Sequence, residues 1–157
     1  MGATGRNLVC SGMAVYGPKT VMLHDVVENE VPQVNEVTLV RGEWITTKAN
    51  LQIKPETKLF APANLRAVNE HDGYKRLIDY WQSNAYTLRY TGGSVPDIYQ
   101  IFIKGSGVFS NPTTAKSPPK LRYLYEAAPM GRLVEIAGGR SSIGQGSVLD
   151  FEIDGYN

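Results

Sequence analysis

The stretch KLRYLYEAAPMGRLVEIAGG, residues 120–139, decides how the C-terminal third of the chain folds. Its apolar residues recur at helical spacing and a glycine pair follows them, so we expect one helix over residues 121–137 with a glycine C-cap. In that helix Glu126 lies on the apolar stripe, where a carboxylate is costly to bury unless a cation or a hydrogen-bond donor meets it. Two interpretations stay open. Either Pro129 ends the helix and leaves Glu126 in solvent, or Glu126 meets a basic side chain or a metal ion.

Outside this helix the chain alternates candidate strands and helices without an internal repeat, which predicts one α/β unit, with a sheet layered between helices as α/β/α. The segment 7–16 reads as a helix or a buried strand, and residues 48–63 read as a loop or an edge strand. We expect strands at 20–27, 36–44, 107–111 and 146–153, and helices at 69–83 and 96–105.

The composition is that of a soluble globular protein with one domain: 157 residues, 42% hydrophobic and 20% charged. The net charge of +1 gives no general attraction to nucleic acid or to anionic membranes, and no apolar run has the length of a membrane span. Nor does the N-terminus read as a secretory signal. The single cysteine, Cys10, excludes an internal disulfide, favours a reducing compartment and, in its apolar run, is expected to be buried. We therefore expect neither a nucleic-acid partner nor a membrane.

Basic residues gather where acids are scarce, because Asp97 is the only acid between residues 89 and 125. A phosphate site and a solvated basic face are equally good interpretations of such a cluster. Three neutral donors, Asn64, Tyr90 and Asn111, could bind the same anion. Two of the lysines flank a stiff Ser-Pro-Pro segment, which would hold them with less loss of entropy. The basic residues are Arg89, Lys104, Lys116, Lys120 and Arg122. No P-loop, zinc site, nucleophile elbow or RNA-binding motif accompanies them.

Three stretches together resemble the C-terminal half of the sugar bisphosphatases, the family of fructose-1,6- and sedoheptulose-1,7-bisphosphatases. They are GRNLVCSGMAVYG at residues 5–17, LRYTGGSVPDIYQIFIKGSGVFSN at 88–111, and the opening stretch. The resemblance covers nearly the whole chain. It implies the sugar-phosphatase fold, with residues 1–157 as the substrate-binding half of a phosphoric monoester hydrolase.

The resemblance also implies roles for individual residues. Glu126 matches a glutamate that binds catalytic Mg²⁺, and Arg122 an arginine near the phosphate that is removed. Lys120 matches a lysine that contacts the sugar, with Lys116 as a further candidate on the same loop. The pocket for the other phosphate is matched by Asn64, Arg89, Tyr90 and the position of Asn111. The family arginine at Arg89 reaches into a neighbouring subunit, which implies a homodimer or a homotetramer.

Three departures from the family pattern matter. Ala67 and Asn111 stand where fructose enzymes usually have tyrosines, which would widen the far phosphate pocket and favours sedoheptulose 1,7-bisphosphate over fructose 1,6-bisphosphate. The metal motif Asp-Pro-x-Asp-Gly-Ser is absent, so we expect the chain alone to be inactive and to belong to a longer polypeptide. A non-catalytic fragment that binds phosphosugars or forms oligomers is the alternative. The family implies the plastid stroma or the cytoplasm as the compartment.

Overall fold

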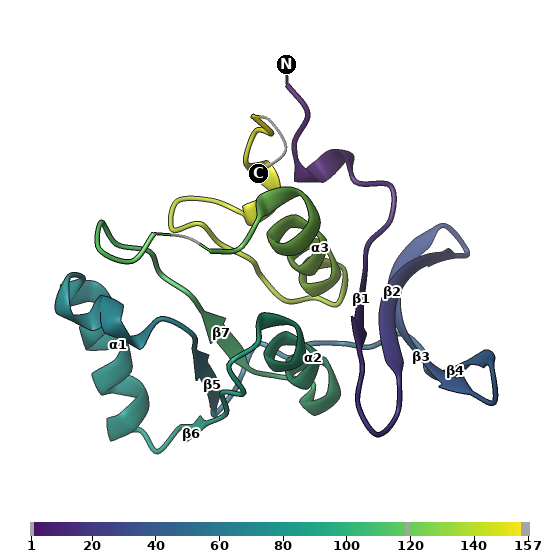
Figure 1. The fold of residues 1–157 in the computed structure, drawn as a ribbon, viewed down its shortest axis with the longest axis horizontal. Helices are drawn as coiled ribbons and strands as arrows, with labels where there is room; N and C mark the ends of the chain where they lie inside the picture. The colour runs from purple at the N-terminus through teal and green to yellow at the C-terminus, as the bar shows by residue number, and fades with distance from the viewer. Residues whose placement is uncertain (1, 119, 155–157) are drawn as a thin grey trace. The chain divides into compact units, whose positions relative to one another are not determined.

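The fold was analysed in a computed structural model that describes residues 2–118 and 120–154. Contacts divide the chain into two compact units (Figure 1). One unit combines residues 1–54 with residues 121–157, and the other is formed by residues 55–120. In the part of the chain that the structure describes, no helix has the length and apolar character needed to cross a membrane.

The first unit is built on a four-stranded antiparallel sheet in sequence order. The eight-residue strand β2 alternates between buried and half-buried side chains over its first six residues, as expected for a strand with one covered face. Positive φ angles at Asn29 and Glu30, and at Arg41 and Gly42, make the two tight turns of the β2–β3–β4 meander. The strands are β1 (Gly12–Val15), β2 (Val21–Glu28), β3 (Val31–Val40) and β4 (Glu43–Lys48).

Helix α3 (Ala128–Ile136) packs on β1, β2 and β3 of this sheet (Figure 1). Its apolar stripe is buried, with Leu133 fully enclosed. A π-helical turn, Tyr123–Ala127, runs directly into α3, and Pro129 lies in the first turn of α3, where a proline is tolerated. Gly138, at a φ of 85°, follows the helix in the left-handed conformation that a glycine C-cap requires. The helix predicted over residues 121–137 is present over residues 123–136, with a π-helical first turn, and Pro129 does not end it.

A buried ion pair joins α3 to β2. The Asp25 side chain is only 3% exposed, and its Oδ2 accepts hydrogen bonds from Arg132 Nη2 at 2.8 Å and Nε at 3.0 Å. Its other oxygen accepts the backbone N–H of Ser11. Because both oxygens have donors, the carboxylate is compensated inside the protein.

The second unit is a three-stranded parallel sheet with helices on both faces. The central strand β5 (Leu59–Pro62) lies between β6 (Thr87–Leu88) and β7 (Val108–Ser110). Phe60 packs on Tyr74, Ile78 and Trp81 of α1 (Asp72–Ser83). Its neighbours Leu59 and Ala61 line a small cavity beside α2 (Ser94–Lys104). Because successive side chains of a strand point to opposite faces, the two helices cover opposite sides of the sheet.

The α/β class is confirmed, and the second unit has the expected sheet between helices. The chain forms two units with separate sheets instead of the one unit expected. Some element assignments were also wrong, because the strand expected at 36–44 spans the end of β3, the turn at Arg41 and Gly42 and the start of β4. The segment expected as a loop or edge strand, residues 48–63, contains the central strand β5. The segment 146–153 forms a 3₁₀ turn, Val148–Asp150, instead of a strand, and Cys10 is exposed instead of buried.

We expect Arg132→Met to lower the free energy of unfolding by about 3 kcal/mol, because it leaves the buried Asp25 carboxylate without its cation. Denaturant unfolding followed by circular dichroism measures the change. The matched control is Arg140→Met, at an exposed arginine, where we expect a change below about 0.5 kcal/mol. Equal effects of the two substitutions would contradict a stabilising role for the ion pair.

Candidate phosphate and metal-binding residues

The predicted phosphate-binding residues of the second unit follow the C-terminal ends of its three parallel strands. Asn64 comes two residues after β5, Arg89 and Tyr90 come directly after β6, and Asn111 comes directly after β7. Parallel strands all end at the same edge of a sheet, and ligands of open α/β sheets bind at that edge. The sheet therefore brings together four residues that are up to 47 positions apart in the sequence.

Asn64 is 6% exposed and holds the loop that follows β7. Its Nδ2 donates to the carbonyl oxygen of Pro112 at 2.7 Å and to Ser117 Oγ at 3.1 Å. If the Asn64 amide were flipped, Oδ1 would face the carbonyl oxygen of Pro112, and two acceptors cannot form a hydrogen bond. The assignment of Nδ2 as the atom that faces Pro112 is therefore correct. Oδ1, the remaining atom, is buried and has no hydrogen-bond partner among the described residues. Both amide protons of Asn64 are thus already bound within the chain.

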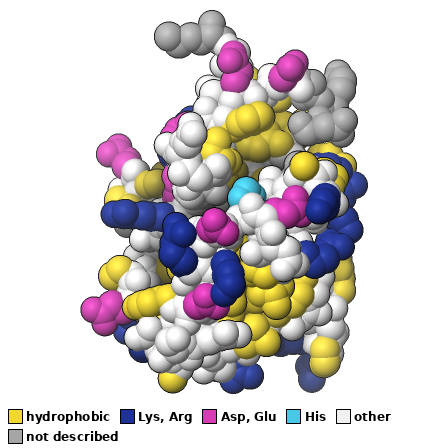
Figure 2. Space-filling view, turned by 90° about the vertical axis from the view of Figure 1, so that its left-hand side faces the viewer, with side chains coloured by type: hydrophobic (Ala, Val, Ile, Leu, Met, Phe, Trp, Pro, Cys, Tyr) yellow, Lys and Arg dark blue, Asp and Glu magenta, His cyan; other side chains and the backbone are white. Residues whose placement is uncertain are grey.

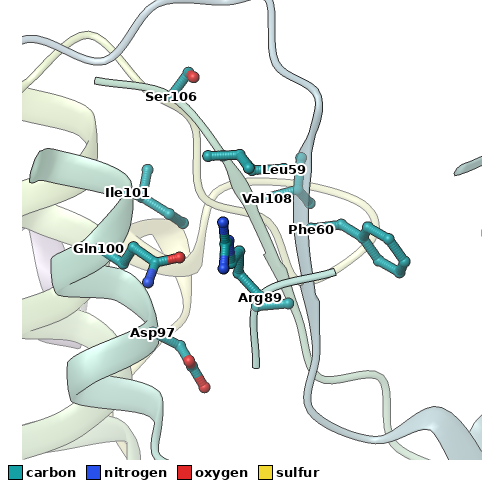
Figure 3. Close-up of a pocket in the computed structure, with 10 residues that line it drawn as sticks. Leu59, Phe60, Arg89, Asp97, Gln100, Ile101, Ser106 and Val108 are labelled. Atoms are coloured by element: carbon teal, nitrogen blue, oxygen red, sulfur yellow. The ribbon is translucent and has the colours of Figure 1, made fainter. Parts of the chain in front are cut away.

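The two residues after β6 point in different directions. The hydroxyl of Tyr90 donates to the carbonyl oxygen of Ala63 at 3.2 Å, next to Asn64. The guanidinium of Arg89 instead points toward Gln100 of α2 (Figure 3). It lines a small cavity of about 10 Å³ between α2 and the sheet. Tyr90 therefore lies with Asn64, whereas the charged end of Arg89 is directed toward α2.

The remaining predicted residues of this unit lie on the loop after β7. Asn111 is half-buried, whereas Lys116 and Lys120 are exposed and form no ion pair within the described part of the chain. Paired hydrogen bonds between Thr114 and Ser117 hold the backbone around Lys116: each backbone N–H donates to the other residue's carbonyl oxygen, at 2.9 and 3.1 Å. Of the Ser-Pro-Pro segment, Pro119 falls outside the described residues. The backbone of Lys116 is therefore held by the hydrogen bonds of this turn, whereas Lys120 lies outside the turn.

Charge on the surface around these elements is mixed. On the face shown in Figure 2, Lys and Arg side chains lie among Asp and Glu side chains. An anion at this face would not be held by a uniform positive field, so its binding would depend on individual donors.

In the first unit, Arg122 and Glu126 form a close ion pair at the start of the π-helical turn. Glu126 Oε2 accepts the backbone N–H of Arg122 at 2.7 Å and its Nε at 2.9 Å, and Oε1 accepts Nη2 at 3.0 Å. These hydrogen bonds from Arg122 hold the pKa of Glu126 at about 2. Glu126 therefore meets a basic side chain, and it lies in the turn that precedes α3 instead of hanging in solvent after a broken helix.

A metal ion needs more ligands than this pair supplies. No group of three or more His, Cys, Asp or Glu side chains that could hold a metal occurs among the described residues. Mg²⁺ binds through several oxygen ligands, and both oxygens of Glu126 already accept hydrogen bonds from Arg122. The described residues therefore do not fit a magnesium site by themselves.

The structure adds two residues to those predicted from the sequence, Arg66 and Ser117. Arg66 Nη2 lies 3.2 Å from Ser117 Oγ, the same oxygen that Asn64 contacts. Both residues stand in segments that the sequence had already singled out, two residues after Asn64 and one residue after Lys116. The sequence alone held no signal for Arg66, because its contact with Ser117 joins residues 51 positions apart.

Comparison with known families places these residues in context. Residues 53–157 match the family model described as the C-terminal domain of fructose-1-6-bisphosphatase. The chloroplastic sedoheptulose-1,7-bisphosphatase of Spinacia oleracea is 44% identical over 153 residues, which are 97% of this chain and 39% of the relative. A class 1 fructose-1,6-bisphosphatase of Geotalea uraniireducens is 34% identical over 155 residues, 98% of this chain and 48% of the relative.

Solved structures agree with this result. A Toxoplasma gondii crystal structure, described as a sedoheptulose-1,7 bisphosphatase, superposes with a TM-score of 0.90 at 43% identity, covering 98% of this chain and 49% of that one. The T-state fructose-1,6-bisphosphatase of Leishmania major gives a TM-score of 0.88 at 31% identity, covering 99% of this chain and 49% of that one.

The chain spans between about two fifths and one half of the length of these relatives. The family match extends from the end of the first unit's sheet segment through the whole second unit to residue 157, which includes every predicted site residue. By this match, and by the fold it shares with the solved structures, the chain belongs to the fructose-1,6-bisphosphatase C-terminal domain family.

Proposed function

We propose that residues 1–157 are the substrate-binding half of a longer sugar bisphosphatase that hydrolyses the 1-phosphate of sedoheptulose 1,7-bisphosphate with Mg²⁺. One observation carries the proposal: Asn64, Tyr90 and Asn111, the residues matched to the family's pocket for the second phosphate, gather at the carboxyl edge of the parallel sheet. The 44% identity to the spinach sedoheptulose enzyme, against 34% to the bacterial fructose enzyme, supports this substrate.

Of the two positions that could set the size of the substrate, Ala67 and Asn111, only Asn111 lies where its side chain can do so. Ala67 is fully buried and packs with Phe60, Tyr74 and Trp81 in the core under α1. Its small side chain is therefore a core feature here and does not widen the phosphate site. Asn111, half-buried at the end of β7, is the position whose size can affect the substrate. Fructose 1,6-bisphosphate is the second candidate, supported by the family model and by the Leishmania structure.

Assembly and compartment belong to the same proposal. The exposed Arg89 directs its guanidinium toward Gln100 of α2 (Figure 3), whereas the Tyr90 hydroxyl donates to the carbonyl oxygen of Ala63. We propose a homodimer or a homotetramer in which Arg89 reaches a neighbouring subunit. The chloroplastic relatives support the plastid stroma, and the cytoplasm is the alternative.

Glu126→Gln should abolish release of phosphate from sedoheptulose 1,7-bisphosphate, in the polypeptide that carries these residues and in the presence of Mg²⁺. The pKa of Glu126 is about 2, so the wild-type carboxylate is charged throughout a neutral assay, and the substitution removes a charge that is present. Steady-state phosphate release is the measurement.

The matched control for that experiment is Asp79→Asn, which neutralises the acid of another exposed i,i+4 pair, with Lys75. It should leave turnover unchanged. Full activity of Glu126→Gln would contradict the metal-ligand role that the family resemblance implies for Glu126. A wild-type protein that binds the bisphosphate without hydrolysing it would favour the non-catalytic alternative.

Asn111→Tyr should shift the ratio of kcat/KM values toward fructose 1,6-bisphosphate, by about tenfold, because an added ring narrows the edge of the sheet where the far phosphate would bind. Competition between the two bisphosphates gives the ratio directly. Thr113→Tyr adds the same ring at an exposed position of the same loop and should leave the ratio unchanged. A constant ratio in Asn111→Tyr would show that Asn111 does not set the substrate length.

The native polypeptide that carries these residues should have an intact mass near twice the 17.3 kDa of this chain, since the relatives are two to two and a half times as long. Mass spectrometry of the protein purified from its source cells measures it. A native mass near 17 kDa would contradict the catalytic proposal and leave phosphosugar binding.

A further inference from the structure

Arg66 is the cation that lies closest to Asn64 in the hydrogen-bond network of the sheet edge. It belongs to the 3₁₀ turn Leu65–Asn69, which begins three residues after the end of β5 and has Asn64 as its N-cap. The side chain is exposed, yet one end is fixed, because Nη2 donates to Ser117 Oγ at 3.2 Å. No acidic side chain forms an ion pair with Arg66 within the described residues.

Ser117 is the fixed point of this arrangement. Its Oγ accepts one hydrogen bond from Asn64 Nδ2 and one from Arg66 Nη2, so both lone pairs of the hydroxyl are used. Ser117 itself is 9% exposed, and its backbone N–H donates to Thr114 Oγ1 at 2.9 Å. A buried hydroxyl on a braced loop can therefore orient an exposed guanidinium.

The count of free donors separates the roles of Asn64 and Arg66. A phosphate accepts hydrogen bonds, so its ligands must have N–H or O–H groups to spare. Both amide protons of Asn64 are bound to Pro112 O and Ser117 Oγ, and the atom left over, Oδ1, is an acceptor. Among the described residues, Arg66 uses one of its five N–H donors on Ser117 and keeps four.

We propose that Arg66 binds the phosphate at the end of the sugar bisphosphate that is not hydrolysed, and that Asn64 and Ser117 act as positioning residues for it. This inference rests on the proposed function. A guanidinium supplies charge-assisted hydrogen bonds, which are stronger than the neutral bonds of a tyrosine hydroxyl. Neither Ala67, which lies in the core, nor Asn111, which is an asparagine, can supply a cation at this edge, so Arg66 is the side chain here that can.

The competing explanation is that Arg66 only braces the loop after β7 through Ser117. If Arg66 only held the loop, its loss would change the kinetics of every substrate alike. If Arg66 binds the far phosphate, its loss changes the kinetics only of substrates that carry that phosphate. The experiment therefore compares two substrates in the polypeptide that carries residues 1–157. They are sedoheptulose 1,7-bisphosphate and sedoheptulose 1-phosphate, which lacks the far phosphate.

In Arg66→Ala we expect KM for the bisphosphate to rise about 10- to 100-fold, as for the loss of hydrogen bonds to a charged group, with kcat within about threefold. The kinetics on the 1-phosphate should stay unchanged. Arg66→Lys should restore part of the lost affinity, because it keeps the charge without the planar fork. Arg76→Ala, at an exposed arginine on α1, is the matched control and should leave both substrates unaffected.

Equal changes on both substrates in Arg66→Ala, or no change on either, would overturn the proposal. If the wild-type protein hydrolyses neither substrate, the proposed function fails, and calorimetric binding of the bisphosphate then decides the role of Arg66 separately. Weaker binding by Arg66→Ala than by wild type and Arg76→Ala would support that role. Equal binding, or no binding by wild type, would overturn it.

Discussion

The parallel pairing of β5 with β6 and β7 is the constraint on which the candidate phosphate site depends. The strands are short, with four, two and three residues, so the pairing itself contributes few hydrogen bonds. The sheet is held by the side chains that cover it, above all the cluster of Phe60 with the aromatic and aliphatic face of α1. Because all three strands end at one edge, three separate loops begin there, and the residues matched to the second phosphate pocket lie within two residues of the strand ends.

The ion pair of Arg122 with Glu126 organises the other unit's candidate residues in a different way. Here no sheet edge collects the groups, because both lie on one turn, four residues apart. The π-helical turn brings the Arg122 backbone N–H and guanidinium onto the same carboxylate. Such turns occur often at functional sites, but an exposed pair of this kind is also an ordinary surface feature, so its geometry alone does not assign a reaction.

Periodicity predicted the elements that bury a continuous apolar face. The helix from Asp72 to Ser83 and the strand from Val21 to Glu28 both have such a face and were found where expected. Strand β5 was missed because a four-residue strand ending in Pro62 has no alternation long enough to recognise, and its central position depends on partners 28 and 48 residues away. The pattern of apolar residues within a short segment does not predict pairing between strands that are far apart in the sequence.

The same limit separates the site residues that the sequence indicated from those it missed. Asn64, Tyr90 and Asn111 could be named from the family resemblance, since each stands in a recognisable stretch. The role of Ala67 could not be read that way, because only packing shows that it faces α1 and not the edge of the sheet. Arg66 was missed for the converse reason: an exposed arginine has no significance in a sequence until its neighbour across the fold is known.

At this sheet edge, the buried polar residues can orient a neighbouring side chain, and the exposed arginine can bind a ligand. Asn64 and Ser117 are nearly enclosed, so their polar atoms must find partners within the protein, and their donors are largely used up in doing so. An exposed side chain keeps its free donors because water satisfies them until a ligand arrives. A buried asparagine that matches a ligand-binding position can therefore act by fixing an exposed cation, and at this sheet edge the geometry gives that relation to Asn64, Ser117 and Arg66.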